Sequence, residues 1–182
     1  KALALARRAK GDDLEQAQDI LGELYALNHL DPETLGIYGR TWMDKYKLSN
    51  DLSDLRTSRK YYAEAFEKSP DDYYTGINAA SKSIFLGEMD KGMAYAEKVA
   101  ELVGDKPVPR DYWQTATIGE VFVIKKQYKE AAAMYQAAVD MASTEKRSHE
   151  STFKQAQLLL EKLGASEADK TLVLSAFSHI SK

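Results

Sequence analysis

The three histidines, His29, His149 and His179, are the residues best suited to bind a metal ion or to transfer protons near neutral pH. They lie far apart in the sequence, and none is followed within its own predicted helix by a second metal ligand three or four residues later. Glu150 directly follows His149, but adjacent residues on a helix face different directions. We therefore interpret the histidines as surface or junction residues and predict no metal site.

Carboxylate pairs and a Ser-His-Glu run are the remaining groups that suggest catalysis. The pairs Asp12-Asp13 and Asp71-Asp72 stand where helices are expected to begin, and capping explains them. The run 148–150 has the residue types of a hydrolytic triad, but triad members converge from separate elements. The sequence also lacks a glycine-rich phosphate loop and any cysteine. We predict no catalytic residue and no cofactor, and an enzyme is the weakest interpretation of this chain.

The charge pattern argues against nucleic acid and membrane as partners. The 182 residues include 25 Lys+Arg and 28 Asp+Glu, a net charge of −3, with both signs interspersed. The densest basic group, Lys125, Lys126 and Lys129, is small for a nucleic-acid-binding face. No apolar run approaches the ~20 residues of a membrane span. The absence of cysteine fits a reducing compartment, so we expect a cytoplasmic location.

The elements that must position these residues are helices that recur in a repeat. Residues 87–96 align with residues 126–135 so that apolar and small positions coincide, and one helix-length segment precedes each copy. A helix, a short turn and a second helix, repeating at about 34 residues, form the tetratricopeptide unit. One unit cannot bury its apolar face alone, so neighbours must stack. We therefore predict an all-α, right-handed tetratricopeptide-like solenoid.

Caps and breaks set the expected boundaries. Asp31 followed by Pro32 opens one helix, Asp111 opens another, and Ser166 starts a last helix that is expected to run to Ile180. The length suits about four to five antiparallel helix pairs in a single domain. The chain begins in an already helical pattern without Met, which we interpret as a segment of a longer protein. The predicted pairs cover residues 1–29, 31–70, 71–104, 111–143 and 147–181.

Details within the repeats give three further expectations. Gly39 and Gly119 occupy the position of the first helix that the paired helix approaches most closely. About seven extra residues, Leu48–Asp54, are expected to form a loop at one edge of the solenoid. Val121–Ile124 has the composition of a strand, but its place in the repeat predicts a helix.

Two segments carry a pattern more specific than repeat spacing. The first comprises Asp31-Pro32-Glu33-Thr34, Gly39-Arg40 and Asp44; the second comprises Ala65-Phe66-Glu67, Ser69-Pro70, Asp72-Tyr73-Tyr74 and Gly76-Ile77-Asn78-Ala79-Ala80. Over roughly residues 31–142 this order resembles the TRAFs-binding, tetratricopeptide-bearing central region of the apoptosis signal-regulating (MAP3) kinases, which also occurs in bacterial proteins. The resemblance implies a helical regulatory scaffold that recruits partners and controls a neighbouring effector domain. The Tyr73-Tyr74 form is more similar to bacterial members, for which TRAF partners would not exist.

A concave groove is the expected binding surface, because the first helix of each tetratricopeptide pair lines it. Two aromatic side chains would supply affinity, while Arg40, Asn78 and Glu120 would supply specificity. Tyr74 and Trp113 could equally pack against the preceding repeat, and both alternatives remain open. The predicted groove residues are Arg40, Asp44, Tyr74, Asn78, Ser81, Phe85, Trp113 and Glu120.

The sequence thus favours a non-catalytic scaffold that binds a protein or peptide partner and regulates an attached effector domain. The alternative is a sensor, in which the same face binds a small ligand or peptide and relays a change in curvature. A thermal-shift screen separates the two, since a sensor is stabilised by its ligand without a protein partner. The oligomeric state is not predicted.

Overall fold

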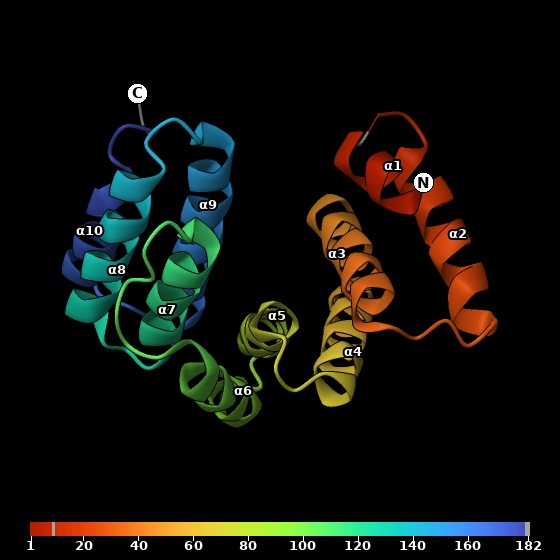
Figure 1. Cartoon of the computed structure of the whole chain (residues 1–182), viewed down its shortest axis with the longest axis horizontal. Helices are drawn as coiled ribbons and strands as arrows, with labels where there is room; N and C mark the ends of the chain where they lie inside the picture. The colour runs from red at the N-terminus through yellow and green to blue at the C-terminus, as the bar shows by residue number, and fades with distance from the viewer. Residues whose placement is uncertain (9, 181–182) are drawn as a thin grey trace. The chain divides into compact units, whose positions relative to one another are not determined.

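The computed structural model describes residues 1–8 and 10–180, and no strand occurs among them (Figure 1). Val121–Ile124 lie within a helix, as predicted. The chain divides into two compact units, Lys1–Lys82 and Ser83–Lys182. That the whole chain forms a single domain stays a prediction. The helices are α1 (Ala2–Arg8), α2 (Asp13–Ala26), α3 (Pro32–Ser49), α4 (Leu52–Lys68), α5 (Tyr73–Phe85), α6 (Met89–Val103), α7 (Tyr112–Ile124), α8 (Tyr128–Met141), α9 (Lys146–Lys162) and α10 (Glu167–Leu174), followed by the 3₁₀ turn η1 (Ser175–Phe177).

The first unit is built on the hairpin of α3 and α4, with α2 packed on α3 and α1 on α2. Tyr38 of α3 and Tyr61 of α4 stack with ring centroids 4.2 Å apart, and the edge of Tyr25 from α2 lies 5.2 Å from the Tyr61 ring. These aromatic contacts join three successive helices into one core. The core residues are Ala2, Leu5, Ala6, Ala17, Leu21, Leu35, Tyr38, Tyr61 and Ala65.

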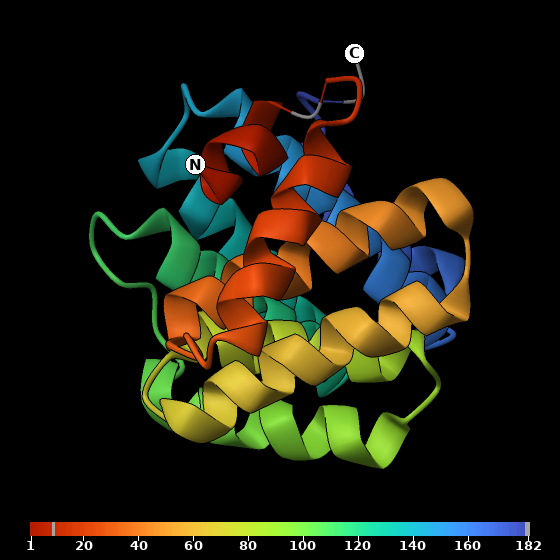
Figure 2. The ribbon, with the colours of Figure 1, turned by 90° about the vertical axis from the view of Figure 1, so that its right-hand side faces the viewer.

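The turn between α3 and α4 differs from the prediction of a loop over Leu48–Asp54. Both helices continue through most of these residues, and only two residues join them (Figure 2). Asn50 ends α3 in a left-handed conformation with φ of 55°, and the Asp51 side chain accepts a hydrogen bond from the Ser53 amide at 2.8 Å. The inserted residues therefore lengthen the hairpin instead of interrupting it.

Close approach at two glycines sets the geometry of the α3–α4 and α7–α8 pairs. A Cβ atom added at Gly39 would lie 2.9 Å from the ring of Tyr62, and one added at Gly119 would lie 2.8 Å from the ring of Tyr135. Real Cβ contacts essentially never come so close. The predicted positions of tightest pairing are confirmed, and each glycine faces a buried tyrosine of the second helix.

In the second unit α7 packs against α6, α8 and α9, and α10 with η1 covers α8 and α9 (Figure 1). Phe177 of η1 is 1% exposed and packs on Tyr135, with the ring centroids 5.3 Å apart. The last helix is shorter than predicted, since α10 ends at Leu174 and tightens into the 3₁₀ turn. This tightening places Phe177 in the core, where a large apolar side chain is best buried.

The predicted helix starts are confirmed by hydrogen bonds at three caps. The Asp31 side chain accepts from the Thr34 amide at 2.9 Å, and Asp111 accepts from the Gln114 amide at the same distance. The Ser166 hydroxyl accepts from the Asp169 amide at 3.1 Å. Each cap satisfies one amide that the first turn of a helix leaves without a partner.

Candidate functional site

Four of the predicted groove residues lie together in the first unit, on α3 and α5. Arg40 and Asp44 form an ion pair at 3.8 Å on α3. Tyr74 of α5 is 47% exposed, and its ring meets that of Tyr62 edge-on at 6.1 Å. The Asn78 amide donates to the Tyr74 carbonyl at 2.9 Å. We name this surface, defined by Arg40, Asp44, Tyr74 and Asn78, the α3–α5 face.

Tyr62 of α4 lies beneath the α3–α5 face. Burial raises the pKa of the Tyr62 hydroxyl well above its usual value, and the neighbouring Tyr74 hydroxyl adds to this effect. Tyr62 therefore stays neutral. Its apolar ring and its hydrogen-bonding hydroxyl form the buried floor of the surface. It occupies a pairing position of the repeat, and this is why the sequence pattern identified it only as a packing residue.

Lys82 is a buried cation at the edge of this surface that the sequence analysis did not select. Its ammonium group donates to Asn78 Oδ1 at 2.7 Å and to the Ser81 hydroxyl at 3.3 Å, and it lies 5.5 Å from the centre of the Tyr62 ring. These contacts fix the orientation of the Asn78 amide. The spacing of four residues between Asn78 and Lys82 was the sequence signal for this pair.

The charges of the α3–α5 face are unequally engaged. Asp44 is bound by Lys47 at 2.8 Å as well as by Arg40 at 3.8 Å. The Arg40 guanidinium therefore has the longer and weaker of the two ion pairs. Since arginine presents five donors in a planar fork, Arg40 is the group on this face most suited to bind a carboxylate or carbonyl oxygen.

The other predicted groove residues have different surroundings. Ser81 and Phe85 are buried side chains. In the second unit Trp113 is 52% exposed and lies edge-on to Tyr112, with ring centroids 5.1 Å apart. Glu120 accepts a hydrogen bond from Gln155 of α9 at 2.8 Å. That any of these residues contacts a partner stays a prediction.

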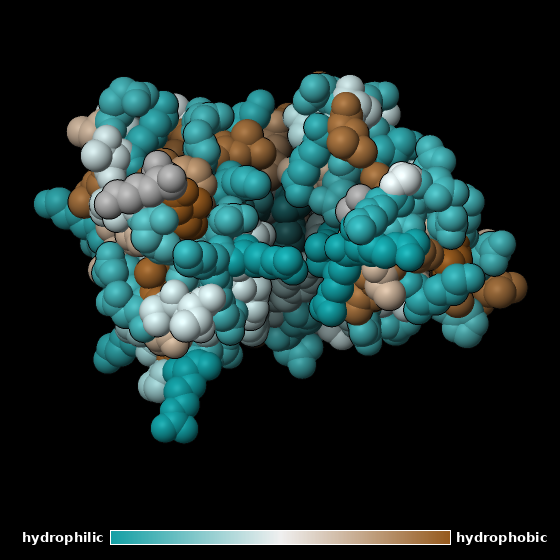
Figure 3. Space-filling view, turned by 90° about the horizontal axis from the view of Figure 1, so that it is seen from above, coloured by the Kyte–Doolittle hydropathy of each residue, from teal (hydrophilic) through white to brown (hydrophobic). Residues whose placement is uncertain are grey.

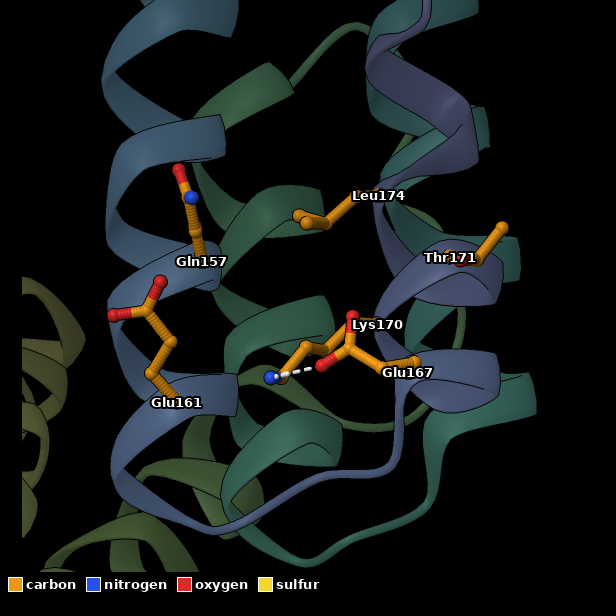
Figure 4. Close-up of a pocket in the computed structure, with 6 residues that line it drawn as sticks. All are labelled: Gln157, Glu161, Glu167, Lys170, Thr171 and Leu174. Carbon is orange, nitrogen blue, oxygen red and sulfur yellow. Dashed lines mark hydrogen bonds and ion pairs between the residues drawn. The ribbon is translucent and has the colours of Figure 1, made fainter.

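One surface depression lies between α9 and α10, with a volume of about 290 Å³ (Figure 4). Lys170 reaches into it and pairs with Glu167 at 2.6 Å, while Glu161 approaches from α9. Contact with Glu167 raises the pKa of Lys170, which therefore stays charged. On the face shown in Figure 3, apolar side chains form separate groups among polar ones.

Two of the histidines meet, contrary to the interpretation of all three as surface or junction residues. His149 is fully buried, and its Nδ1 lies 2.9 Å from Nε2 of His179. The signal was present in α9, where His149 stands four residues before Phe153 and seven before Ala156 on the apolar stripe. Among the described residues no group of three or more His, Cys, Asp or Glu side chains could hold a metal ion. None of the described helices is both long and apolar enough to cross a membrane.

Paired helices, a glycine at the tightest contact of the α3–α4 and α7–α8 hairpins and caps at helix starts define a helical repeat protein of the tetratricopeptide type. Residues 1–84 match the family described as TPR-S, Tetratricopeptide Repeats-Sensor. The chain is also 30% identical over 147 residues to the mitogen-activated protein kinase kinase kinase nsy-1 of Caenorhabditis elegans. That match covers 71% of this chain but only 10% of the kinase. The predicted resemblance to MAP3 kinases and to tetratricopeptide proteins is confirmed.

Solved structures support the same fold. The structure titled MamA AMB-1 superposes with a TM-score of 0.51 at 13% identity, covering 99% of this chain and 93% of that one. A MamA structure from Desulfovibrio magneticus RS-1 gives a TM-score of 0.50 at 16% identity, covering 100% and 94%. The all-α, tetratricopeptide-like solenoid is therefore confirmed.

Proposed function

We propose that this chain is a non-catalytic regulatory segment that binds a protein or peptide partner through the α3–α5 face and controls an attached effector domain. The observation that carries the proposal is the half-exposed Tyr74 ring seated on buried Tyr62, whose hydroxyl also interacts with the charge of Arg40. An aromatic anchor beside an arginine is the composition that dominates binding energy at protein interfaces. The similarity to a much longer protein kinase supports the effector part of the proposal.

Selection from a displayed random peptide library tests the binding part. Enriched peptides should lose about tenfold or more in affinity for Tyr74→Ala and for Arg40→Ala, since each substitution removes a central contact. Leu172→Ala is the control, because it removes an exposed apolar side chain that belongs to the other unit and is not a predicted groove residue. Peptides that bind all three variants as well as the unaltered chain would place recognition away from the α3–α5 face.

A sensor is the second candidate function, and one observation favours it. The family described as a tetratricopeptide sensor matches residues 1–84, nearly the same residues as the first compact unit. In this form the α3–α5 face binds a small ligand or free peptide. A thermal-shift screen of metabolites should then find a compound that raises the melting temperature by mass action, and Arg40→Ala should abolish that rise.

A further inference from the structure

His149 and His179 join two parts of the second unit that lie 30 positions apart in the sequence. His149 is in the first turn of α9 and is fully buried, whereas His179 follows η1 and is exposed. The two rings are perpendicular, with centroids 5.0 Å apart, and Nδ1 of His149 faces Nε2 of His179 at 2.9 Å. This contact fastens the segment after η1 to α9.

The separation of the two nitrogens identifies the contact as a direct hydrogen bond. Two nitrogens bound to one tetrahedral zinc ion at 2.0–2.1 Å lie about 3.3 Å apart, which is longer than the observed distance. No third ligand completes a metal site among the described residues. One imidazole must therefore donate a proton and the other must accept it.

The surroundings of His149 disfavour a charge on its ring. The Tyr112 ring of α7 stacks on it at 5.5 Å, and the Tyr112 hydroxyl bonds to Thr152 of α9 at 2.8 Å. Among the described residues Nε2 of His149 makes no well-formed hydrogen bond. The groups that favour a charge are the Ala142 carbonyl at the end of α8 and Glu145, the residue that precedes α9. Glu145 is itself bound by the Ser148 hydroxyl at 2.9 Å.

Burial lowers the pKa of His149, and the charge that His179 can carry lowers it further; Ala142 and Glu145 oppose the shift only in part. A histidine in the opened state has an ordinary pKa near 6.5. The opened state therefore takes up protons at a higher pH than the docked state does. Docking is at full strength above about pH 6.5 and weakens as the pH falls below that value.

We propose that His149 and His179 form an acid-sensitive latch, which holds residues 178–180 against α9 at neutral pH and releases them when both rings are protonated. One added proton leaves a donor and an acceptor in the contact, so the hydrogen bond persists. A second proton removes the acceptor and places two cations at hydrogen-bond distance. Opening thus requires acid. The pH at which the contact opens is a property of the coupled pair of rings rather than of either ring alone.

Amide hydrogen exchange of the whole chain tests the latch. The Ile180 amide bonds to the Phe177 carbonyl at 2.9 Å and reports docking of the segment. After correction for intrinsic exchange, protection of Ile180 should fall about tenfold or more between about pH 7.5 and pH 5. In His179→Gln, whose carboxamide hydrogen-bonds without titrating, the fall should be clearly smaller, because only the burial of His149 still couples docking to pH.

His29→Gln is the control, because His29 is exposed and belongs to the first unit. It should leave the response of Ile180 unchanged. A parallel NMR titration of the ring protons should show the pKa of His149 rising toward its ordinary value in His179→Gln. Protection that is equal at both pH values in the unaltered chain, or that falls as steeply in His179→Gln as in the unaltered chain, would overturn the proposal.

Discussion

The α3–α4 and α7–α8 hairpins have the same internal construction and opposite surroundings. Each holds a buried tyrosine against a glycine of its first helix, and burial raises the pKa of both Tyr62 and Tyr135. The aromatic neighbour of Tyr135 is Phe177, which is buried, whereas the neighbour of Tyr62 is the half-exposed Tyr74. The same repeat geometry therefore has a buried aromatic side chain packed on Tyr135 and a half-exposed one packed on Tyr62.

Aromatic truncation tests this contrast with the largest expected effect. Phe177→Ala should lower the free energy of unfolding by about 3–5 kcal/mol, because it leaves a cavity beside Tyr135. Tyr74→Ala should cost less than about 1.5 kcal/mol, since much of that ring is already in water. Urea unfolding followed by circular dichroism measures both values, and equal losses would refute the distinction between a closed and an open hairpin.

Glycine substitution tests what the two hairpins share. Gly39→Leu and Gly119→Leu should each destabilise the chain by about 1–3 kcal/mol, because the new side chain overlaps a tyrosine ring. The measurement is the melting curve of each variant.

Alanine at a third glycine supplies the control. A Cβ atom at Gly22 would meet only the Tyr38 hydroxyl, at 3.2 Å. Gly22→Ala should be neutral or stabilising by up to about 1 kcal/mol, since alanine favours the helix. Gly39→Ala and Gly119→Ala should instead destabilise. An unchanged melting curve for the Gly39 and Gly119 variants would contradict the repeat register.

The smallest expected effect is a loss of stability in acid that comes from the first unit. In the first unit Asp13 accepts hydrogen bonds from Arg8 and from the Lys10 amide, and these contacts lower its pKa to about 2. The unfolded carboxyl has a pKa near 3.9, so the contribution is complete above that value and is lost as the pH falls toward 2. Melting temperatures of the unaltered chain and of Asp13→Asn should differ at neutral pH and converge near pH 2. A difference in melting temperature that persists near pH 2 would show that the lowered pKa of Asp13 is not the cause of the acid sensitivity.

Much of the fold could be predicted because it follows from local chemistry and periodicity. Asp31, Asp111 and Ser166 cap helices through bonds to amides three residues on, and such bonds can be read from adjacent positions. The α3–α4 turn could not be predicted, because seven additional residues fit either a loop or longer helices. The choice depends on the left-handed Asn50 and on contacts of Asp54 with Ser49 and Lys45.

The candidate site was predictable only in part, for a related reason. Positions on one helix predicted that Arg40 and Asp44 would be neighbours, and the repeat placed Tyr74 nearby. The role of Lys82 depends on its burial, and the meeting of His149 with His179 depends on a 3₁₀ turn that no periodic pattern encodes.

The long α3–α4 hairpin also constrains how this family of chains can change in length. With 18 and 17 residues, its arms exceed the 13 and 14 of α7 and α8, and its tip exposes 80% of Leu48. α3 exceeds α7 by five residues and α4 exceeds α8 by three, which together make about two helical turns. A single inserted residue would rotate the remainder of its helix by about 100°, whereas about seven residues shared between the arms add close to two full turns. Natural variants of this hairpin should accordingly grow or shrink in steps near seven.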